Sequence, residues 1–172
     1  MSHSNYSKKK FEEAMADFAS QNYAKSIEHL SQAIKVDPGF SLALKSRGAA
    51  LLRLDKFQDA ISDFTKVIEM DPENARAFHL RGLAFEKFGG NDKALDDFNR
   101  AIALNPSYGA AYHSRALLHT KMGNTDMATE DIQMVAHLAE VNIEAFSNDN
   151  NVWRSQQLRL ESMYHDNITM ER

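Results

Sequence analysis

The sequence contains no cysteine, and this absence excludes a disulfide framework, a thiolate metal site and a cysteine nucleophile. It has only 3 prolines and 7 glycines, too few for a β-sandwich or β-barrel, because those folds depend on many tight turns. No window approaches the roughly 18 apolar residues that a membrane-spanning helix needs. The composition therefore favours long helices and predicts no membrane insertion.

Basic residues are not in excess, since the formal net charge of the 172-residue chain is -4. A nucleic-acid-binding protein usually carries a basic excess, because Lys and Arg side chains neutralise phosphates. The charge therefore disfavours nucleic acid as a partner. No apolar stretch follows the basic residues Lys8 to Lys10, which predicts that the chain has no secretory signal peptide and is cytoplasmic.

Three prolines divide the chain at a constant interval. Pro38, Pro72 and Pro106 are 34 residues apart, and each closes a run with helical apolar spacing. Proline ends such a helix because it lacks the N–H and clashes with the preceding turn. At this period the chain divides into blocks 7–40, 41–74, 75–108 and 109–142. Small residues then recur at two positions of the repeat, which are Ala14, Gly48, Gly82 and Ala116, and Ser26, Ala60, Ala94 and Ala128. Large apolar residues recur at a third position, which is Leu30, Phe64, Phe98 and Ile132.

Each block predicts two helices joined by a short turn. In the second block the apolar residues of 41–54 and of 57–70 each fall on one helix face, with Asp55 and Lys56 between the two runs. The small residues allow the paired helices to approach closely, and the large residue fills the space beside them. Because one hairpin cannot bury both apolar faces, neighbouring blocks are expected to stack.

This pattern resembles the tetratricopeptide repeat family. It is carried in the second block by Leu44, Gly48, Ala60, Phe64 and Pro72, and in the third by Phe78, Gly82, Ala94, Phe98 and Pro106. The resemblance covers residues 7–142. It implies an all-α, right-handed superhelical α-solenoid of four helix-turn-helix repeats, at 7–40, 41–74, 75–108 and 109–146, that acts as a non-enzymatic scaffold for protein–protein interaction. Residues 1–6 are expected to form a disordered N-terminus.

The two outer blocks depart from the family pattern. The first has Lys10 at the bulky position, and the fourth has Glu140 in place of the proline. Without that proline, we expect the last helix of the fourth repeat to continue to about Phe146. Residues 147–172 are then expected to form a loop, a C-terminal capping helix around Trp153 and a frayed tail, since solenoid ends need a polar-faced cap. In the alternative, this helix docks on a second chain and makes a homodimer of an otherwise monomeric protein.

A charge pair recurs in three blocks. An arginine precedes an aspartate by 16 residues at one fixed place in the repeat: Arg47 and Asp63, Arg81 and Asp97, and Arg115 and Asp131. The arginine lies on the first predicted helix, and the aspartate lies on the helix that folds back beside it. We therefore predict a repeated salt bridge between helices, within a block or across to its neighbour.

The family resemblance also implies a binding surface, because the first helices of such repeats line a concave groove that holds a peptide. The residues at the family's groove positions form two basic ladders, one further arginine and an apolar floor: Lys45, His79 and His113; Arg53, Lys87 and Lys121; Arg76; and Ala49, Leu83 and Leu117. In the first block the corresponding residues are apolar, namely Phe11, Met15 and Phe18. Basic side chains over an apolar strip favour a protein or peptide partner that bears carboxylates.

Other functions have less support. Some family members grip chaperone C-termini with a fixed Lys, Asn, Asn, Lys, Arg set, but here only one of the five corresponding residues is basic in either frame, which excludes that clamp. No catalytic, metal-binding or cofactor-binding motif is present, because the histidines are scattered and His137 and Glu140 lack a third ligand. Two alternatives stay open, an assembly or secretion chaperone that shields an apolar client segment and a self-assembling structural unit.

Overall fold

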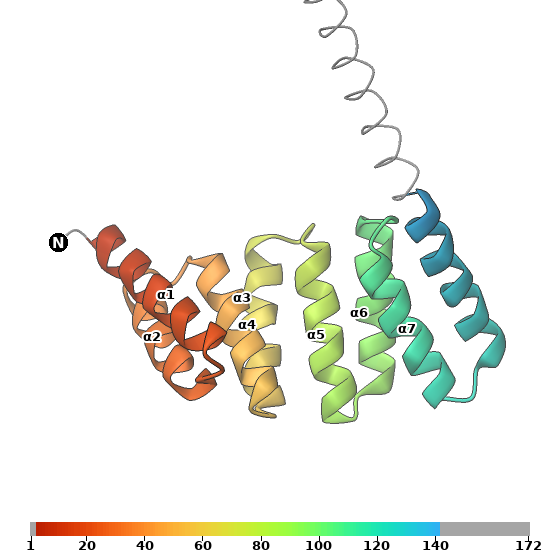
Figure 1. The fold of residues 1–172 in the computed structure, drawn as a ribbon, viewed down its shortest axis with the longest axis horizontal. Coiled ribbons are helices and arrows are strands. Elements are labelled where there is room, and N and C mark those ends of the chain that lie inside the picture. Colours follow the sequence, from red (N-terminus) through yellow and green to blue (C-terminus); the bar gives the residue numbers. More distant parts are fainter. Residues whose placement is uncertain (1–2, 142–172) are drawn as a thin grey trace, which may run out of the picture. The chain divides into compact units, whose positions relative to one another are not determined.

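The computed structural model describes residues 3–141, and every regular element in this range is a helix (Figure 1). The bounded helices are α1 His3–Ala19, α2 Tyr23–Val36, α3 Ser41–Arg53, α4 Phe57–Met70, α5 Ala75–Phe88, α6 Asn91–Leu104 and α7 Gly109–Lys121. Residues 125–141 are also helical. The chain divides into two units between Ile132 and Gln133, and the packing described below belongs to the first unit.

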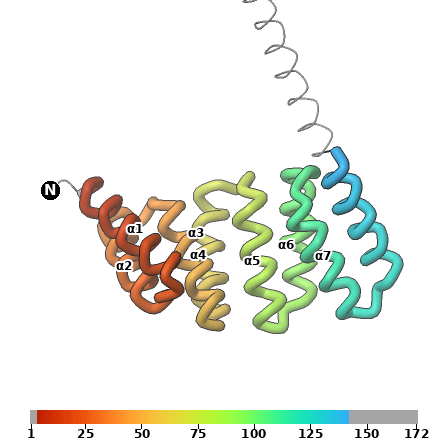
Figure 2. The backbone as a smooth tube through the Cα atoms, viewed as in Figure 1, coloured from red at the N-terminus to blue at the C-terminus, as the bar shows by residue number. Residues whose placement is uncertain are grey.

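Helices that are adjacent in the sequence are adjacent in the fold (Figure 2). Each helix from α1 to α6 packs against the next one, and α5 also contacts α3 and α7. The pairs α1–α2, α3–α4 and α5–α6 are therefore the predicted hairpins. The first helices of the second, third and fourth repeats contact one another in turn. The predicted all-α helical repeat fold is confirmed.

The small residues of the repeat allow the two helices of a hairpin to make close contact. A Cβ atom on Gly48 would lie 2.6 Å from Cε1 of Phe64, and one on Gly82 would lie equally close, 2.6 Å, to the phenylalanine of the third repeat. The first repeat instead pairs Ala14 with the smaller Leu30, and both residues are fully buried. Glycine is therefore paired with phenylalanine in the second and third repeats, and alanine is paired with the smaller leucine in the first. Each pair fills the space between its two helices.

Every hairpin turn places one residue in the left-handed region of the backbone. These residues are 34 apart in the sequence, with φ of 61° at Gln21, 56° at Asp55, 93° at Gly89 and 81° at Gly123. Glycine adopts this conformation freely, whereas an L-residue brings its Cβ close to a carbonyl oxygen. The first two turns nevertheless use Gln and Asp, so helix packing determines the turn geometry and the local sequence accommodates it.

Helix α1 begins earlier than the sequence predicts. It starts at His3, so residues 3–6 form its first turn, and this corrects the expectation of a disordered segment there. Ser7 is buried, and its Oγ donates a hydrogen bond to the carbonyl of Ser4 at 3.1 Å. The predicted helix end near Phe146 and the predicted capping helix within 147–172 lie outside the described residues.

The predicted salt bridges form within each of the three blocks. Nε and Nη2 of Arg47 donate to the two carboxylate oxygens of Asp63 at 2.8 and 2.7 Å. The same two-bond geometry joins Arg81 to Asp97 and Arg115 to Asp131. Paired, charge-assisted bonds of this kind are among the stronger polar contacts in proteins. The hydrogen bonds that Arg47 and Arg115 donate to Asp63 and Asp131 raise the pKa of both arginines above the ordinary value.

The third nitrogen of each guanidinium connects neighbouring repeats. Nη1 donates to a side-chain oxygen on the second helix of the preceding repeat, which is Ser31 for Arg47, Thr65 for Arg81 and Asn99 for Arg115. Each arginine therefore binds its own hairpin and the hairpin before it. The sequence predicted the Arg–Asp bridge, within a block or across to its neighbour, and did not predict the bond from Nη1 to the preceding repeat.

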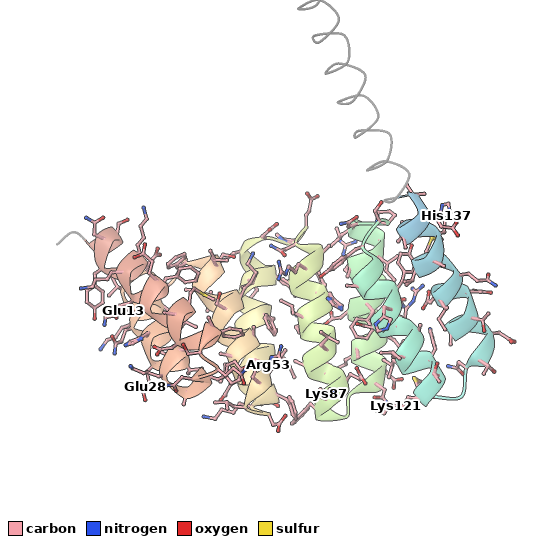
Figure 3. The ribbon with its side chains drawn as sticks, in the orientation of Figure 1. Glu13, Glu28, Arg53, Lys87, Lys121 and His137 are labelled. Atoms are coloured by element: carbon pink, nitrogen blue, oxygen red, sulfur yellow. The ribbon has the colours of Figure 1, made fainter. Side chains whose placement is uncertain are left out.

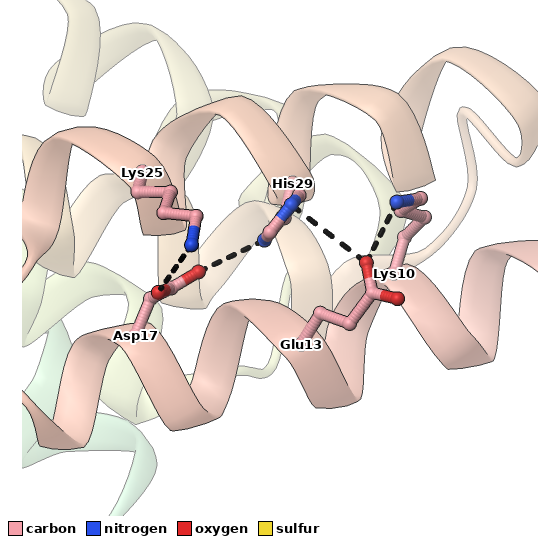
Figure 4. A network of polar contacts seen from close by, with 5 residues as sticks. All are labelled: Lys10, Glu13, Asp17, Lys25 and His29. Carbon is pink, nitrogen blue, oxygen red and sulfur yellow. Dashed lines mark hydrogen bonds and ion pairs between the residues drawn. The ribbon is translucent and has the colours of Figure 1, made fainter.

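The first repeat has a different network at this place (Figure 4). Glu13 and His29 occupy the repeat positions of the arginine and the aspartate, so the acidic and basic groups have exchanged helices. His29 Nε2 lies 3.7 Å from Glu13 Oε2, and His29 Nδ1 lies 2.9 Å from Asp17 Oδ2. Two lysines complete the network, with Lys10 Nζ at 2.6 Å from Glu13 and Lys25 Nζ at 3.7 Å from Asp17. The hydrogen bond from Lys10 lowers the pKa of Glu13.

Candidate functional site

A pocket of about 260 Å³ lies among three first helices, α1, α3 and α5, and we call it the first-helix pocket. Its wall is mostly apolar, with two cations and no carboxylate: Met15, Phe18, Leu42, Lys45, Ser46, Ala49, Arg76 and Leu80. Helix α1 contributes the first two residues, α3 the next four and α5 the last two. Three of the predicted site residues, Lys45, Ala49 and Arg76, therefore come together here.

The two cations of the pocket are available to a ligand. Neither Lys45 nor Arg76 takes part in an ion pair or a hydrogen bond within the described part of the chain. This distinguishes them from Arg47, Arg81 and Arg115, each of which has an aspartate partner. Unpaired cations beside an apolar wall attract a carboxylate and bind it by charge-assisted hydrogen bonds.

The second basic ladder lies away from this pocket. Arg53, Lys87 and Lys121 are exposed and lie at the C-terminal ends of α3, α5 and α7 (Figure 3). Along α5, Lys87 is about 16 Å from Arg76 at 1.5 Å per residue. Positive charge at a helix C-terminus also stabilises the helix itself through the helix dipole. Lys121 has a partner, since its Nζ lies 3.8 Å from Oε1 of Glu86.

The structure corrects the role expected for His79. The ring is buried, with Nδ1 3.1 Å from the hydroxyl of Tyr108 and Nε2 2.9 Å from Oγ of Ser114. The ring of Tyr108 also packs edge-on against it, with centroids 5.1 Å apart. Burial, with a smaller contribution from the charge of Arg76, lowers the pKa of His79 to about 4. His79 is therefore a neutral link between α5 and α7, whereas a ligand-binding ladder would require an exposed side chain.

The remaining predicted positions lie elsewhere. Leu83 packs into the core beside Phe98, and His113 and Leu117 are exposed on α7 but do not line the pocket. In the first repeat Met15 and Phe18 line the pocket as expected. Phe11 packs against Phe40, with ring centroids 5.2 Å apart, and does not line the pocket.

Sequence reasoning omitted three residues of the pocket from the predicted site, although the repeat contained a signal for them. Leu42 occupies the repeat position of Arg76, and Ser46 occupies that of Leu80. A residue that faces the binding surface in one repeat is expected to do so in the next, because the repeats share one backbone geometry. Because Arg76 was a predicted site residue, Leu42 at the equivalent position of the second repeat should have been predicted as well.

Two further properties concern the described part of the chain. Between residues 3 and 141, no helix is long and apolar enough to cross a membrane. The same residues contain no group of three His, Cys, Asp or Glu side chains that could hold a metal ion.

Stacked helical hairpins with a pocket among their first helices define a helical repeat protein. The tetratricopeptide repeat family model matches residues 11–75 and 46–109, which together make up more than half of the chain. The chain belongs to the tetratricopeptide repeat family, whose members serve as protein-interaction scaffolds. No curated protein sequence matches the chain.

Solved structures share the fold. MamA residues 41 to the end from Desulfovibrio magneticus RS-1 is 20% identical, with a TM-score of 0.74 over 78% of this chain and 76% of that one. The Arabidopsis OM64 TPR domain is 28% identical, with a TM-score of 0.66 over 69% and 98%. The first TPR of Spaghetti (RPAP3), bound to the HSP90 peptide SRMEEVD, is 21% identical, with a TM-score of 0.66 over 69% and 94%.

Proposed function

We propose that this scaffold binds a partner protein by taking a carboxylate and a neighbouring apolar side chain of the partner into the first-helix pocket. The observation that carries the proposal is the pair of unpaired cations, Lys45 and Arg76, in a wall otherwise made of apolar groups and one hydroxyl. The carboxylate would accept hydrogen bonds from these cations, and the apolar side chain would cover Met15, Phe18 and Leu80.

The size of the pocket favours part of a peptide over a small molecule. Pockets for drug-sized ligands usually measure about 300–1,000 Å³, whereas this one measures about 260 Å³. The packed helices fix the positions of α3 and α5 before binding, so the receptor loses little conformational entropy when the ligand enters. These properties suit a short segment of a folded or disordered partner.

The Spaghetti domain supports the acidic character of the ligand, because its peptide SRMEEVD contains three carboxylate side chains. The wall of the present pocket differs, however, from the Lys, Asn, Asn, Lys, Arg clamp of some family members. Counted from the first repeat, the five clamp positions are Phe11, Met15, Ser46, Arg76 and Leu80, of which only Arg76 is basic. We therefore expect fewer charged contacts and a larger apolar contribution than such a clamp would use.

Selection of peptides on the full chain tests the proposal. A displayed library of seven-residue peptides with free C-termini should yield binders that combine an acidic group with a neighbouring large apolar residue. The affinity of a selected peptide, measured by fluorescence anisotropy, should fall about tenfold or more in the Lys45→Glu/Arg76→Glu variant, since each lost charge-assisted bond is worth about 1.5–3 kcal/mol.

A matched control separates the pocket from general electrostatic attraction. The variant Lys9→Glu/Arg53→Glu changes the net charge by the same amount at exposed residues outside the pocket. Its affinity for the peptide should stay close to that of the wild type, and circular dichroism should show that both variants are folded. An equal loss in the two variants, or binders without carboxylates, would overturn the proposal.

A further inference from the structure

The turn between α5 and α6 forms a second pocket, which we call the turn pocket. Its volume is about 720 Å³, within the range typical of ligand sites. Its apolar wall consists of Ile61 from α4, Phe85 and Phe88 from α5, and Met122 at the end of α7. None of these residues lines the first-helix pocket, so the turn pocket is a separate feature of the molecule.

Large apolar side chains recur at this edge with the period of the repeat. Leu54, Phe88 and Met122 occupy one repeat position and are 38%, 57% and 39% exposed. Isolated exposed apolar residues are ordinary on a protein surface, but a set that recurs at one edge of consecutive repeats is typical of an interaction site. The first repeat has Ser20 at this position, so the apolar edge belongs to the later repeats.

The aromatic rings of the turn pocket differ in exposure and partners. Phe85 packs against core residues and has the ammonium of Lys93 5.5 Å from its ring centroid. Phe88, the last residue of α5, belongs to neither of these core clusters. Phe85 therefore provides a packed floor for an incoming ring, and Phe88 provides an exposed aromatic rim beside it.

Charge selects the partner for this surface. Lys93 lines the pocket, whereas Lys87 does not line it but precedes Phe88 at the end of α5. Both lysines are exposed, and within the described residues neither forms an ion pair. Asp92 is the carboxylate that the wall contains. Two free cations beside one carboxylate and an apolar cavity complement an apolar side chain with acidic neighbours.

We propose that the turn pocket is a second protein-interaction site, which accepts an aromatic side chain flanked by carboxylates on a partner protein. The ring would insert between Phe85, Phe88 and Met122, and the flanking carboxylates would pair with Lys87 and Lys93. This inference stands on the turn pocket alone and does not depend on what binds among the first helices.

Nuclear magnetic resonance of the full chain tests the site directly. The probe is the peptide acetyl-Asp-Glu-Trp-Glu-Asp-amide, and its Trp→Ala counterpart is the control ligand. The tryptophan peptide should shift the backbone amide signals of Gly89, Gly90 and Lys93, and the alanine peptide should leave them in place. The shifts at Gly89, Gly90 and Lys93 should persist in the Lys45→Glu/Arg76→Glu variant, which separates this site from the first-helix pocket.

A matched pair of variants completes the test. Phe88→Ser should weaken binding of the tryptophan peptide about tenfold or more. Leu117→Ser should leave the affinity unchanged, because Leu117 is as exposed as Phe88, at 57%, but lies outside the turn pocket. The proposal would be overturned if the peptide shifted the same signals equally in the Phe88→Ser variant, or if the shifts were confined to the first-helix pocket. It would also be overturned if the Gly89 and Gly90 signals moved on dilution of the chain without peptide, since that would identify a second copy as the occupant.

Discussion

In the second, third and fourth repeats an arginine on the first helix holds an aspartate on the second, whereas in the first repeat the corresponding residues are Glu13 and His29. The arginine uses its third nitrogen to bind the preceding repeat. Among the described residues no helix precedes α1, so a guanidinium at position 13 would lack that third partner. The comparison indicates that the Arg–Asp pair connects repeats as well as the helices within one.

Removing the arginine from an inner repeat should have the largest effect on stability. Arg81→Ala leaves the carboxylate of Asp97 buried without its partner, and loss of one member of a buried pair costs about 3 kcal/mol. Urea unfolding measures this loss in the free energy of unfolding. Glu13→Ala removes the corresponding side chain of the first repeat, which is 33% exposed, and should change the free energy of unfolding far less. Equal shifts in the two variants would contradict the comparison.

A methyl group added between the helices of an inner repeat should have the next largest effect. Gly82→Ala places a Cβ 2.6 Å from Cε1 of Phe98, and overpacking of this kind costs about 2 kcal/mol. The first repeat accommodates alanine at this position because its partner is Leu30. The added cost of Gly82→Ala should therefore be smaller in a Phe98→Leu background, and a double-mutant cycle measures this coupling. Additive effects would show that the two side chains do not compete for space.

Acid should weaken the contact between the third and fourth repeats. The pKa of His79 is about 4 in the folded chain and near 6.5 when exposed, so the unfolded chain binds the proton first. The contribution of His79 to stability is therefore complete well above pH 6.5 and falls progressively as the pH decreases towards 4, by about 2 kcal/mol at pH 5.

Hydrogen exchange at pH 7 and pH 5 locates this effect of acid. Amides of α7 should lose protection at pH 5 more than amides of α3, because His79 binds Tyr108, the N-cap residue of α7, and Ser114 within α7. The variant His79→Gln, which cannot take up the proton, should show a smaller difference between the two pH values. An unchanged difference in this variant would assign the acid sensitivity to another group.

A single hydroxyl in the first repeat should have the smallest effect. Ser26 is fully buried and its Oγ has no hydrogen-bond partner within the described residues, whereas the later repeats have Ala60, Ala94 and Ala128 at this position. Ser26→Ala should raise the free energy of unfolding by about 1 kcal/mol, because it removes an unsatisfied polar group. The reverse change, Ala94→Ser, should lower it. A loss of stability in Ser26→Ala would show that the hydroxyl has an unrecognised partner.

Much of this fold could be predicted from the sequence because the constraints that define it are local or periodic. Prolines 34 residues apart mark the ends of α2, α4 and α6, and the apolar spacing marks the face that each helix buries. The constant separation of 16 residues predicts the pairing of Arg81 with Asp97, since helix length and turn length together determine which side chains meet. The start of α1 was missed because no breaker marks it.

The candidate site was only partly predictable. Arg53, Lys87 and Lys121 share a repeat position and do share an edge of the fold, but that edge lies away from the pocket. The pocket depends on how α1 and α5 lie beside α3, and one repeat alone does not specify this.

The sequence by itself determined the period, the hairpins, the close Gly–Phe contacts and the Arg–Asp pairs, because each depends on residues at fixed separations along the chain. Only the tertiary structure decided which of the residues at equivalent repeat positions line the first-helix pocket. Lys45 and His79 share one repeat position, yet Lys45 lines a pocket, whereas His79 is buried against Tyr108, the N-cap residue of α7, and Ser114 within α7. The physical reason is that exposure depends on the neighbouring repeat, whose side chains differ even where its backbone does not.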